Sequence, residues 1–304
     1  MSEKTLRIVL GAVAVLVVLY AVTALASRAP SDGSAETDAL AETLAGAWTD
    51  DVATVRILAQ DDTITLERAD GGWTVNGHPA DSALVARFRD GLGDARVAHL
   101  AAANPANHAR LGVSADSARV LEFLRPDGDG TRLLIGDRGP SYQSAYVRLP
   151  DRDEVYLVRG DLRGPAQRDA DDWRDKTILR VDTAAVRRIA VSRDGEHYTL
   201  ARDSAGWKLD GEPASAGAVR DLLGELARLE AVGFAPDSVV PAEPTRSVIA
   251  LGEQGDTLAD VSLSESEDAN LLVTVPGRDA VFELSSWRAD RLAPERSAVV
   301  EEDT

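Results

Sequence analysis

A sixteen-residue stretch of this chain occurs twice, and no other feature constrains the fold as strongly. Residues 65–80 read TLERADGGWTVNGHPA and residues 199–214 read TLARDSAGWKLDGEPA, so the copies match at eight of sixteen positions. We call the number of residues between equivalent positions of the two copies, such as Thr65 and Thr199, the repeat offset. Average residue usage would give about one match by chance. The chain therefore contains an internal repeat, and we expect two units that are built alike.

The matched residues are typical of turns that flank a short strand. The eight pairs are Thr65/Thr199, Leu66/Leu200, Arg68/Arg202, Gly72/Gly206, Trp73/Trp207, Gly77/Gly211, Pro79/Pro213 and Ala80/Ala214. A glycine before each tryptophan can adopt a positive φ in the turn, and a proline cannot continue a hydrogen-bonded ladder. We therefore predict a structural core of the repeat, formed by Gly72, Trp73, Gly77, Pro79, Gly206, Trp207, Gly211 and Pro213.

The two repeated tryptophans, Trp73 and Trp207, are expected to be core residues. Each indole can bury a large apolar surface beneath the helix that follows it. The alternative is an exposed aromatic ring that stacks on a sugar or a peptide. Because both copies share the surrounding hydrophobic residues as well as the tryptophan, the structural interpretation is favoured.

The sequence around each repeat predicts short strands joined by turns, with one main helix in each unit. In the first unit Asp81 is a suitable N-cap, and the following residues place an apolar stripe at helical spacing. This stripe consists of Leu84, Val85, Phe88 and Leu92. In the second unit Ser215 stands at the place of Asp81, and the stripe consists of Val219, Leu222, Leu223, Leu226 and Leu229. Because most strands are joined without helices between them, we predict an α+β protein with mostly antiparallel sheets.

Residues 8–26 form an uninterrupted and almost wholly apolar run of nineteen residues. About 20 helical residues cross the hydrocarbon core of a membrane, so the run predicts a transmembrane anchor. Lys4 and Arg7 precede it, which indicates a cytoplasmic N-terminus and export of the rest of the chain. The alternative is a signal peptide cleaved after Ala26, although the run exceeds the usual signal-peptide core of about 7–15 residues.

These patterns predict an N-terminal transmembrane helix followed by two tandem repeated α+β units. The expected organisation is a cytoplasmic stub and anchor (1–27), an acidic tether (28–47), a first unit (48–168), a connector (169–183), a second unit (184–292) and a polar tail (293–304). Within the tether we expect a short helix around Asp38–Leu44. A chain of 304 residues with 44% hydrophobic content is large enough to build two cores of ordinary domain size.

The chain resembles a bacterial domain-of-unknown-function family, DUF4340. The resemblance lies in the strand–turn–Gly–Trp pattern at Ile64–Val75 and Tyr198–Leu209, and in two further segments. These are LLIGDRGPSYQSAYVRLPDRDEVYLV at Leu133–Val158 and WRDKTILRVD at Trp173–Asp182. The resemblance implies two tandem units of a membrane-anchored extracytoplasmic protein, often found alongside ABC-transporter-like permease components, including those tied to gliding motility. It transfers no catalytic residue.

Composition excludes several classes of function. The chain has no cysteine, which excludes disulfides, thiolate metal sites and a cysteine nucleophile. Its net charge of −18 argues against binding to nucleic acid, whose phosphates require a basic surface. The sequence contains no Walker A loop, GxSxG elbow or HExxH pair.

Residues with catalytic or metal-binding potential are present, but none forms a recognised motif. His78 and His108 have no visible partner, and neither Lys176 nor Lys208 is favoured as part of a Ser–Lys dyad. Residues 127–130 match a hairpin turn better than a calcium loop. The acidic runs at 169–172 and 265–268 could bind a cation, but such runs are usually solvated. We therefore expect no cofactor and no resident metal.

The sequence thus predicts a membrane-anchored extracytoplasmic interaction module without enzymatic activity. We expect it to serve an ABC-transporter-like or envelope complex, with a protein partner in the membrane and no nucleic acid. The alternatives are an extracytoplasmic ligand binder and a carboxylate-dependent envelope hydrolase.

Overall fold

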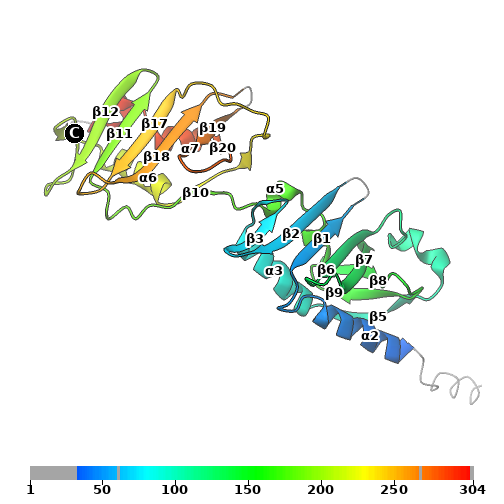
Figure 1. Ribbon diagram of the computed structural model, residues 1–304. Coiled ribbons are helices and arrows are strands. Elements are labelled where there is room, and N and C mark those ends of the chain that lie inside the picture. The colour runs from blue at the N-terminus through cyan, green and yellow to red at the C-terminus, as the bar shows by residue number, and fades with distance from the viewer. Residues whose placement is uncertain (1–32, 60–61, 267–268, 302–304) are drawn as a thin grey trace, which may run out of the picture. The chain divides into compact units, whose positions relative to one another are not determined.

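The chain divides into two units in the computed structural model, which describes residues 33–59, 62–266 and 269–301. Unit one ends at Trp173, and unit two begins at Arg174 (Figure 1). The predicted transmembrane segment, residues 8–26, lies outside the described residues. Within those ranges, no helix has both the length and the apolar character needed to cross a membrane.

Unit one is built on a sheet of nine strands. The strands are β1 (Thr54–Leu58), β2 (Thr63–Ala69), β3 (Gly72–Val75), β4 (His78–Pro79), β5 (Arg96–Ala102), β6 (Arg119–Leu124), β7 (Gly130–Arg138), β8 (Ser144–Arg148) and β9 (Val155–Arg159). They are ordered β4-β3-β2-β1-β6-β7-β8-β9-β5 across the sheet. The predicted hairpins β6–β7 and β8–β9 are confirmed, because each pair is antiparallel and adjacent.

Helices cover one face of this sheet. They are α2 (Gly33–Gly46), α3 (Ser82–Gly93), α4 (Arg163–Ala166) and α5 (Ala170–Trp173). Helix α3 confirms the predicted stripe, since its buried residues are Leu84, Val85, Phe88 and Leu92. The predicted N-cap is also confirmed, because the Asp81 carboxylate accepts hydrogen bonds from the N–H groups of Ala83 at 2.8 Å and Leu84 at 3.0 Å.

A helix is present in the expected tether, as predicted around Asp38–Leu44, but α2 is longer than that range and packs into unit one. Leu40 and Leu44 lie one helical turn apart on α2 and are almost fully buried in the core of unit one. Two buried leucines favour a docked helix by about 1.5–3 kcal/mol each, before the entropy cost of ordering the chain. The small, acidic residues around them concealed this apolar stripe in the sequence.

The expected connector also contributes to the core of unit one. Trp173 ends helix α5 and is fully buried, with its ring centroid 5.6 Å from that of Phe88. Its carbonyl oxygen accepts a hydrogen bond of 2.8 Å from the N–H of Asp81, the residue that caps α3. The charged residues 168–176 therefore hold one large apolar anchor, which closes the unit.

The opposite face of the sheet is covered at one end by two short 3₁₀ helices, η1 (Pro105–Asn107) and η2 (Ala109–Leu111). Leu111, Val113 and Val155 form a small cluster there. The buried guanidinium of Arg148 donates to the carbonyl oxygen of Val113 at 3.1 Å and to those of three residues in the β8–β9 turn. This segment explains why strands β8 and β9 are buried on both faces.

Unit two has a second sheet of nine strands. These are β11 (Arg188–Arg193), β12 (Glu196–Arg202), β13 (Trp207–Leu209), β14 (Glu212–Pro213), β16 (Gly233–Phe234), β17 (Arg246–Leu251), β18 (Thr257–Ser264), β19 (Asn270–Thr274) and β20 (Phe282–Ser285). Their order is β14-β13-β12-β11-β17-β18-β19-β20-β16, which repeats the order of the first sheet strand for strand. A further small sheet pairs β10 (Thr177–Leu179) with β15 (Leu229–Glu230).

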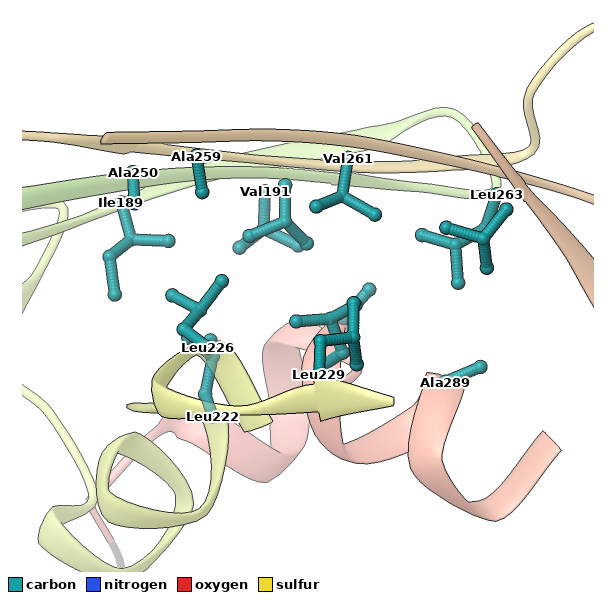
Figure 2. Packing of buried hydrophobic residues seen from close by; sticks show 14 of the residues in the cluster. Ile189, Val191, Leu222, Leu226, Leu229, Ala250, Ala259, Val261, Leu263 and Ala289 are labelled. Carbon is teal, nitrogen blue, oxygen red and sulfur yellow. The ribbon is translucent and has the colours of Figure 1, made fainter. Parts of the chain in front are cut away.

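Three helices cover one face of the second sheet: α6 (Ala216–Ala227), α7 (Ser286–Leu292) and α8 (Arg296–Val299). Figure 2 shows Leu222 and Leu226 of α6 pointing toward Val191, Val261 and other small apolar residues of the sheet. The predicted stripe on α6 is confirmed at Val219, Leu222 and Leu226. Leu223 is half-buried, and Leu229 lies beyond the helix in β15.

An ion pair joins α6 to α7. The carboxylate of Glu225, which is buried, lies 2.7 Å from the guanidinium of Arg288 and 3.6 Å from that of Arg291. Pairing offsets the cost of burying the Glu225 charge beneath α7. Unit two therefore has a second substantial helix, where the sequence predicted only one per unit.

The expected polar tail also forms part of unit two. Val299 of α8 is fully buried, and its carbonyl oxygen accepts a hydrogen bond of 2.9 Å from the N–H of Ser215. This bond corresponds to the one between Asp81 and Trp173 in unit one, because Ser215 and Asp81 both cap the main helix. Each unit is thus closed by the last short helix of its own segment.

The structure confirms an α+β protein with antiparallel sheets. Every pairing between described strands is antiparallel. Hairpin connections supply most of these neighbours, and the main helix of each unit is inserted between the fourth strand and the strand at the far edge.

Replacing Trp173 with alanine is expected to destabilise the protein by about 3–5 kcal/mol, because the substitution leaves a large cavity beneath Phe88. Trp287→Ala is a matched control, since that side chain is 62% exposed, and should change stability by less than about 1 kcal/mol. Urea unfolding of both variants measures the difference. Equal losses for the two variants would contradict the assignment of Trp173 to the core.

Candidate functional site

The repeated stretch forms the same elements in both units. In unit one it covers β2 to β4 and leads into α3, and in unit two it covers β12 to β14 and leads into α6. Strand pairing is also the same, since Trp73 lies opposite Arg68 and Trp207 lies opposite Arg202. The repeat offset therefore relates structurally equivalent positions through this region.

The second turn of the repeat depends on an Asn-Gly or Asp-Gly pair. Asn76 and Asp210 have positive φ values of 46° and 48°, and the glycines that follow them also have positive φ. The Asn76 side-chain oxygen accepts from the N–H of Thr65 at 2.9 Å, and the Asp210 carboxylate accepts from the N–H of Thr199 at 3.0 Å. A short polar side chain thus fixes the turn in both units.

One consequence is electrostatic. The hydrogen bond from the Thr199 N–H holds the pKa of the Asp210 carboxyl below its usual range, and Arg296 adds to this through a hydrogen bond of 3.0 Å. The neutral Asn76 makes the corresponding bond in unit one without a charge.

The predicted glycines and prolines have structural positions. Gly72 and Gly206 have φ values of 138° and 136°, as expected for the turn before each tryptophan. Pro79 and Pro213 lie in the two-residue edge strands β4 and β14. A proline is tolerated there because the edge of a sheet does not require its missing N–H.

The predicted burial of the two tryptophans is only partly realised. Trp73 and Trp207 are half-buried, and both pack against the margin of their core. In unit one the ring of Trp73 meets the ring of Trp48 edge-on, with centroids 5.5 Å apart and planes at 75°. The guanidinium of Arg68 also lies over the Trp73 ring, 5.9 Å from the ring centroid.

Trp48 is the residue that completes this aromatic cluster, and the sequence did not single it out. It is 8% exposed and lies between Trp73 and the core, with its ring 5.2 Å from Phe88 and 5.6 Å from Phe123. The edge-to-face contacts, which Trp48 makes with Trp73 and Phe88, contribute about 0.5–1.5 kcal/mol each beyond the burial of area. In unit one, Trp48 therefore covers the repeated tryptophan.

In unit two the corresponding surface is open. An apolar pocket of about 460 Å³ lies beside the indole of Trp207 and the face of α6. We call it the Trp207 pocket, and it is lined by Thr183, Gly206, Trp207, Ala214, Ala216, Val219, Arg220, Leu223, Gly224 and Ala227. By the repeat offset, Asp182 stands where unit one has Trp48.

A second, polar cavity lies in unit one. It has a volume of about 450 Å³ and is lined by Ala59, Asp62, Ser117, Ala118, Arg119, Arg168 and Asp169. It takes up one end of the predicted acidic run at 169–172. Both charge signs are present in its lining, so it lacks the single-sign field that would select an ion.

The other candidate residues occupy ordinary structural positions. His108 Nε2 lies 2.8 Å from the carbonyl oxygen of Asp153, and His78 is half-buried in β4. Lys208 lies 3.0 Å from the Asp203 carboxylate, and its hydrogen bond lowers the pKa of that group. Residues 127–130 lead from β6 into β7, which confirms a hairpin.

Metal binding finds no support in the part of the chain that the structure describes. Within residues 33–59, 62–266 and 269–301, no group of three or more His, Cys, Asp or Glu residues is placed to hold a metal ion. The predicted acidic run at 265–268 extends beyond the described residues at positions 267 and 268.

Comparison with protein families matches residues 73–247 to the family described as Domain of unknown function (DUF4340). The chain belongs to the DUF4340 family. The match is continuous from the repeated Trp73 of unit one into β17 of unit two, so it spans parts of both units. That each unit is itself a copy of the DUF4340 domain stays a prediction. Neither curated proteins nor solved structures give a match to this chain.

The two repeated tryptophans are expected to respond differently to truncation. Trp73→Ala removes the contact with Trp48 and should destabilise the protein by about 3 kcal/mol, toward the lower end of the range for buried aromatics. Trp207→Ala removes one wall of an open pocket and should cost about 1–2 kcal/mol. Thermal unfolding of the full chain gives both values, and a larger loss for Trp207→Ala would contradict this assignment.

Proposed function

We propose that this DUF4340 protein is a membrane-anchored extracytoplasmic interaction module that serves an ABC-transporter-like or envelope complex. On this proposal it binds a protein partner and performs no chemistry of its own. Residues 8–26 support the anchor, because their uninterrupted apolar run has the length of a membrane span. The basic residues before this run support an outer location for the two units.

The observation that supports an interaction role is the Trp207 pocket. Tryptophan and arginine are enriched at the centres of protein interfaces, where an apolar pocket accepts an anchor side chain from the partner. The pocket combines the Trp207 indole, the apolar side chains Val219 and Leu223, and the exposed Arg220 at its rim. No carboxylate is among its lining residues in the described chain, so it is unsuited to acid–base hydrolysis.

We also propose that the two units are tandem copies of one module. The matching sequence stretch, the constant repeat offset through β1 to α3, and the shared strand order support this duplication. After duplication, two related surfaces can diverge in what they bind.

The second candidate is an extracytoplasmic ligand binder, and the volume of the Trp207 pocket favours it over a hydrolase. At about 460 Å³ the pocket lies toward the small end of the range of about 300–1,000 Å³ that small-molecule sites occupy. A thermal-shift screen with small aromatic and aliphatic compounds tests this candidate.

Export is testable because the chain has no cysteine. A single Tyr142→Cys variant places a thiol at a side chain that is 85% exposed in unit one. A maleimide that cannot cross membranes should label this variant in intact spheroplasts as fully as in lysed ones. The wild-type chain is the control and should take up no label. Labelling only after lysis would exclude the proposed location.

Co-purification tests the interaction role itself. The full chain, tagged at its C-terminus, is crosslinked in the native host, solubilised gently and analysed by mass spectrometry. We expect a permease or ATP-binding subunit in near-stoichiometric amount. Recovery of the protein alone would contradict the accessory role and leave the ligand binder as the better candidate.

A further inference from the structure

We propose that the Trp207 pocket binds the tryptophan side chain of a partner protein, in a segment where acidic residues follow that tryptophan. This inference rests on the proposed interaction role and specifies the chemistry of the partner. Unit one shows the arrangement, because the chain itself supplies there the tryptophan that unit two lacks.

The equivalence of the two surfaces follows from strand register. Thr54 of β1 pairs with Glu67 of β2, and their counterparts at the repeat offset, Arg188 of β11 and Ala201 of β12, pair with each other. The same offset relates the turn residues Asn76 and Asp210, which make the same hydrogen bond to the backbone. The segment that precedes β1 therefore corresponds residue by residue to the segment that precedes β11.

This segment differs in the two units. It reads Trp48-Thr49-Asp50-Asp51 in unit one and Asp182-Thr183-Ala184-Ala185 in unit two. The threonine is shared, and in unit two it lines the Trp207 pocket. Unit two thus keeps the backbone of the segment but has no aromatic side chain in it to cover Trp207.

The helix beside the pocket, α6, also has smaller side chains than α3 at two equivalent positions. Phe88 of α3, which packs against Trp48, corresponds to the smaller Leu222 of α6. Asp90 corresponds to Gly224, at which an added side chain would meet no atom within 4 Å. Both replacements make the side chain smaller, and Gly224 lines the Trp207 pocket, so the missing side chain at this position leaves space in the pocket.

Charge indicates what surrounds the incoming tryptophan. In unit one, Asp50 lies 3.3 Å from the guanidinium of Arg89, its carbonyl oxygen accepts from Arg68, and Asp51 lies 3.9 Å from Arg125. The acidic residues after Trp48 are therefore held by arginines.

Unit two does not keep the arginines that pair with Asp50 and Asp51, since Leu223 and Gly252 stand at the places of Arg89 and Arg125, but it has two other basic residues at this surface. Arg202 is the matched counterpart of Arg68, and Arg220 lines the Trp207 pocket. Both side chains are exposed, and no carboxylate in the described part of the chain forms an ion pair with either. Carboxylates that follow the partner's tryptophan would meet these two guanidinium groups, which favours the acidic segment over a neutral or basic one.

The test uses the full chain and a labelled peptide that copies the arrangement of unit one, LAGAWTDDVA (residues 44–53). Fluorescence anisotropy measures binding of this peptide and of its Trp48→Ala form. Loss of an aromatic anchor at an interface should weaken binding by at least about tenfold. Equal binding of the two peptides, or binding of neither, would overturn the proposal.

Variants of the protein locate the binding site. Gly224 lines the Trp207 pocket and has room for a Cβ atom, so Gly224→Trp places a large side chain at the pocket and should weaken binding of the peptide by at least about tenfold. The matched control is Asp90→Trp, the equivalent position in unit one, which should leave binding unchanged. Arg220→Glu should weaken binding several-fold at low salt, and replacing both aspartates of the peptide with asparagine should remove this difference. Unchanged binding by Gly224→Trp would show that the peptide binds elsewhere.

Two further measurements separate the possible failures. If N-acetyltryptophanamide binds as tightly as the peptide, the pocket accepts a small aromatic ligand and the proposed partner class is wrong. If a membrane partner co-purifies with the wild-type chain and equally with Gly224→Trp, the interaction role stands but the Trp207 pocket does not mediate it. Reduced recovery with Gly224→Trp, and not with Asp90→Trp, would support both proposals.

Discussion

Each unit of this protein depends on the covering of one face of a nine-stranded antiparallel sheet. Strands alternate their side chains between two faces, so an apolar face must be buried by helices or it is exposed to water. The main helix in each unit, α3 or α6, covers the centre of that face and is fixed at its N-terminus by two devices. One is the side-chain cap at Asp81 or Ser215, and the other is a backbone hydrogen bond to the last short helix of the unit.

The two units bury the rest of this apolar sheet face with different residues. Unit one uses large rings, since Trp48, Phe88, Phe123 and Trp173 pack together beneath α2 and α3. Unit two has an aliphatic residue, Leu222, at the place of Phe88, and it adds a second helix, α7, which the buried Glu225 holds against α6. The same backbone thus tolerates two different sets of core residues, as expected when volume and pattern are kept. The core residues of unit two include no ring in the place of Trp48.

Sequence patterns predicted the helices, turns and strands whose formation depends on residues close together in the chain. The α3 stripe, the turns at Asn76 and Asp210, and the strand-rich second half of each unit are legible in the sequence because each depends on neighbours along the chain. Residues whose role depends on distant contacts were misjudged. Leu40 and Leu44 stand among small acidic residues, and Trp173 stands in a run of charges, yet all three are buried. Burial of such isolated apolar residues is set by what they meet in three dimensions.

The same limit applies to the candidate site. The repeat identified Trp73 and Trp207 as equivalent, and both are half-buried, but the repeat does not show what lies beside each of them. Their environments differ because of a third residue outside the matched stretch, Trp48 in unit one and Asp182 in unit two. A comparison of the two repeated stretches therefore predicts the backbone of the site, but it does not predict whether the tryptophan is covered or beside an open pocket.

This difference gives the duplication a physical rationale. A half-buried indole beside open apolar space leaves a tryptophan and its neighbours in contact with water, and covering them would stabilise the unit by roughly 25 cal/mol per Å² of apolar area. Unit one gains that stability within its own chain through Trp48. Unit two forgoes it, although a single change at Asp182 or Gly224 would place a side chain over the surface. A stabilising change that is so accessible and yet is not made is typical of a surface kept open for binding, where stability is given up for function. The filled site of unit one then serves as the structural reference for what the open site of unit two accepts.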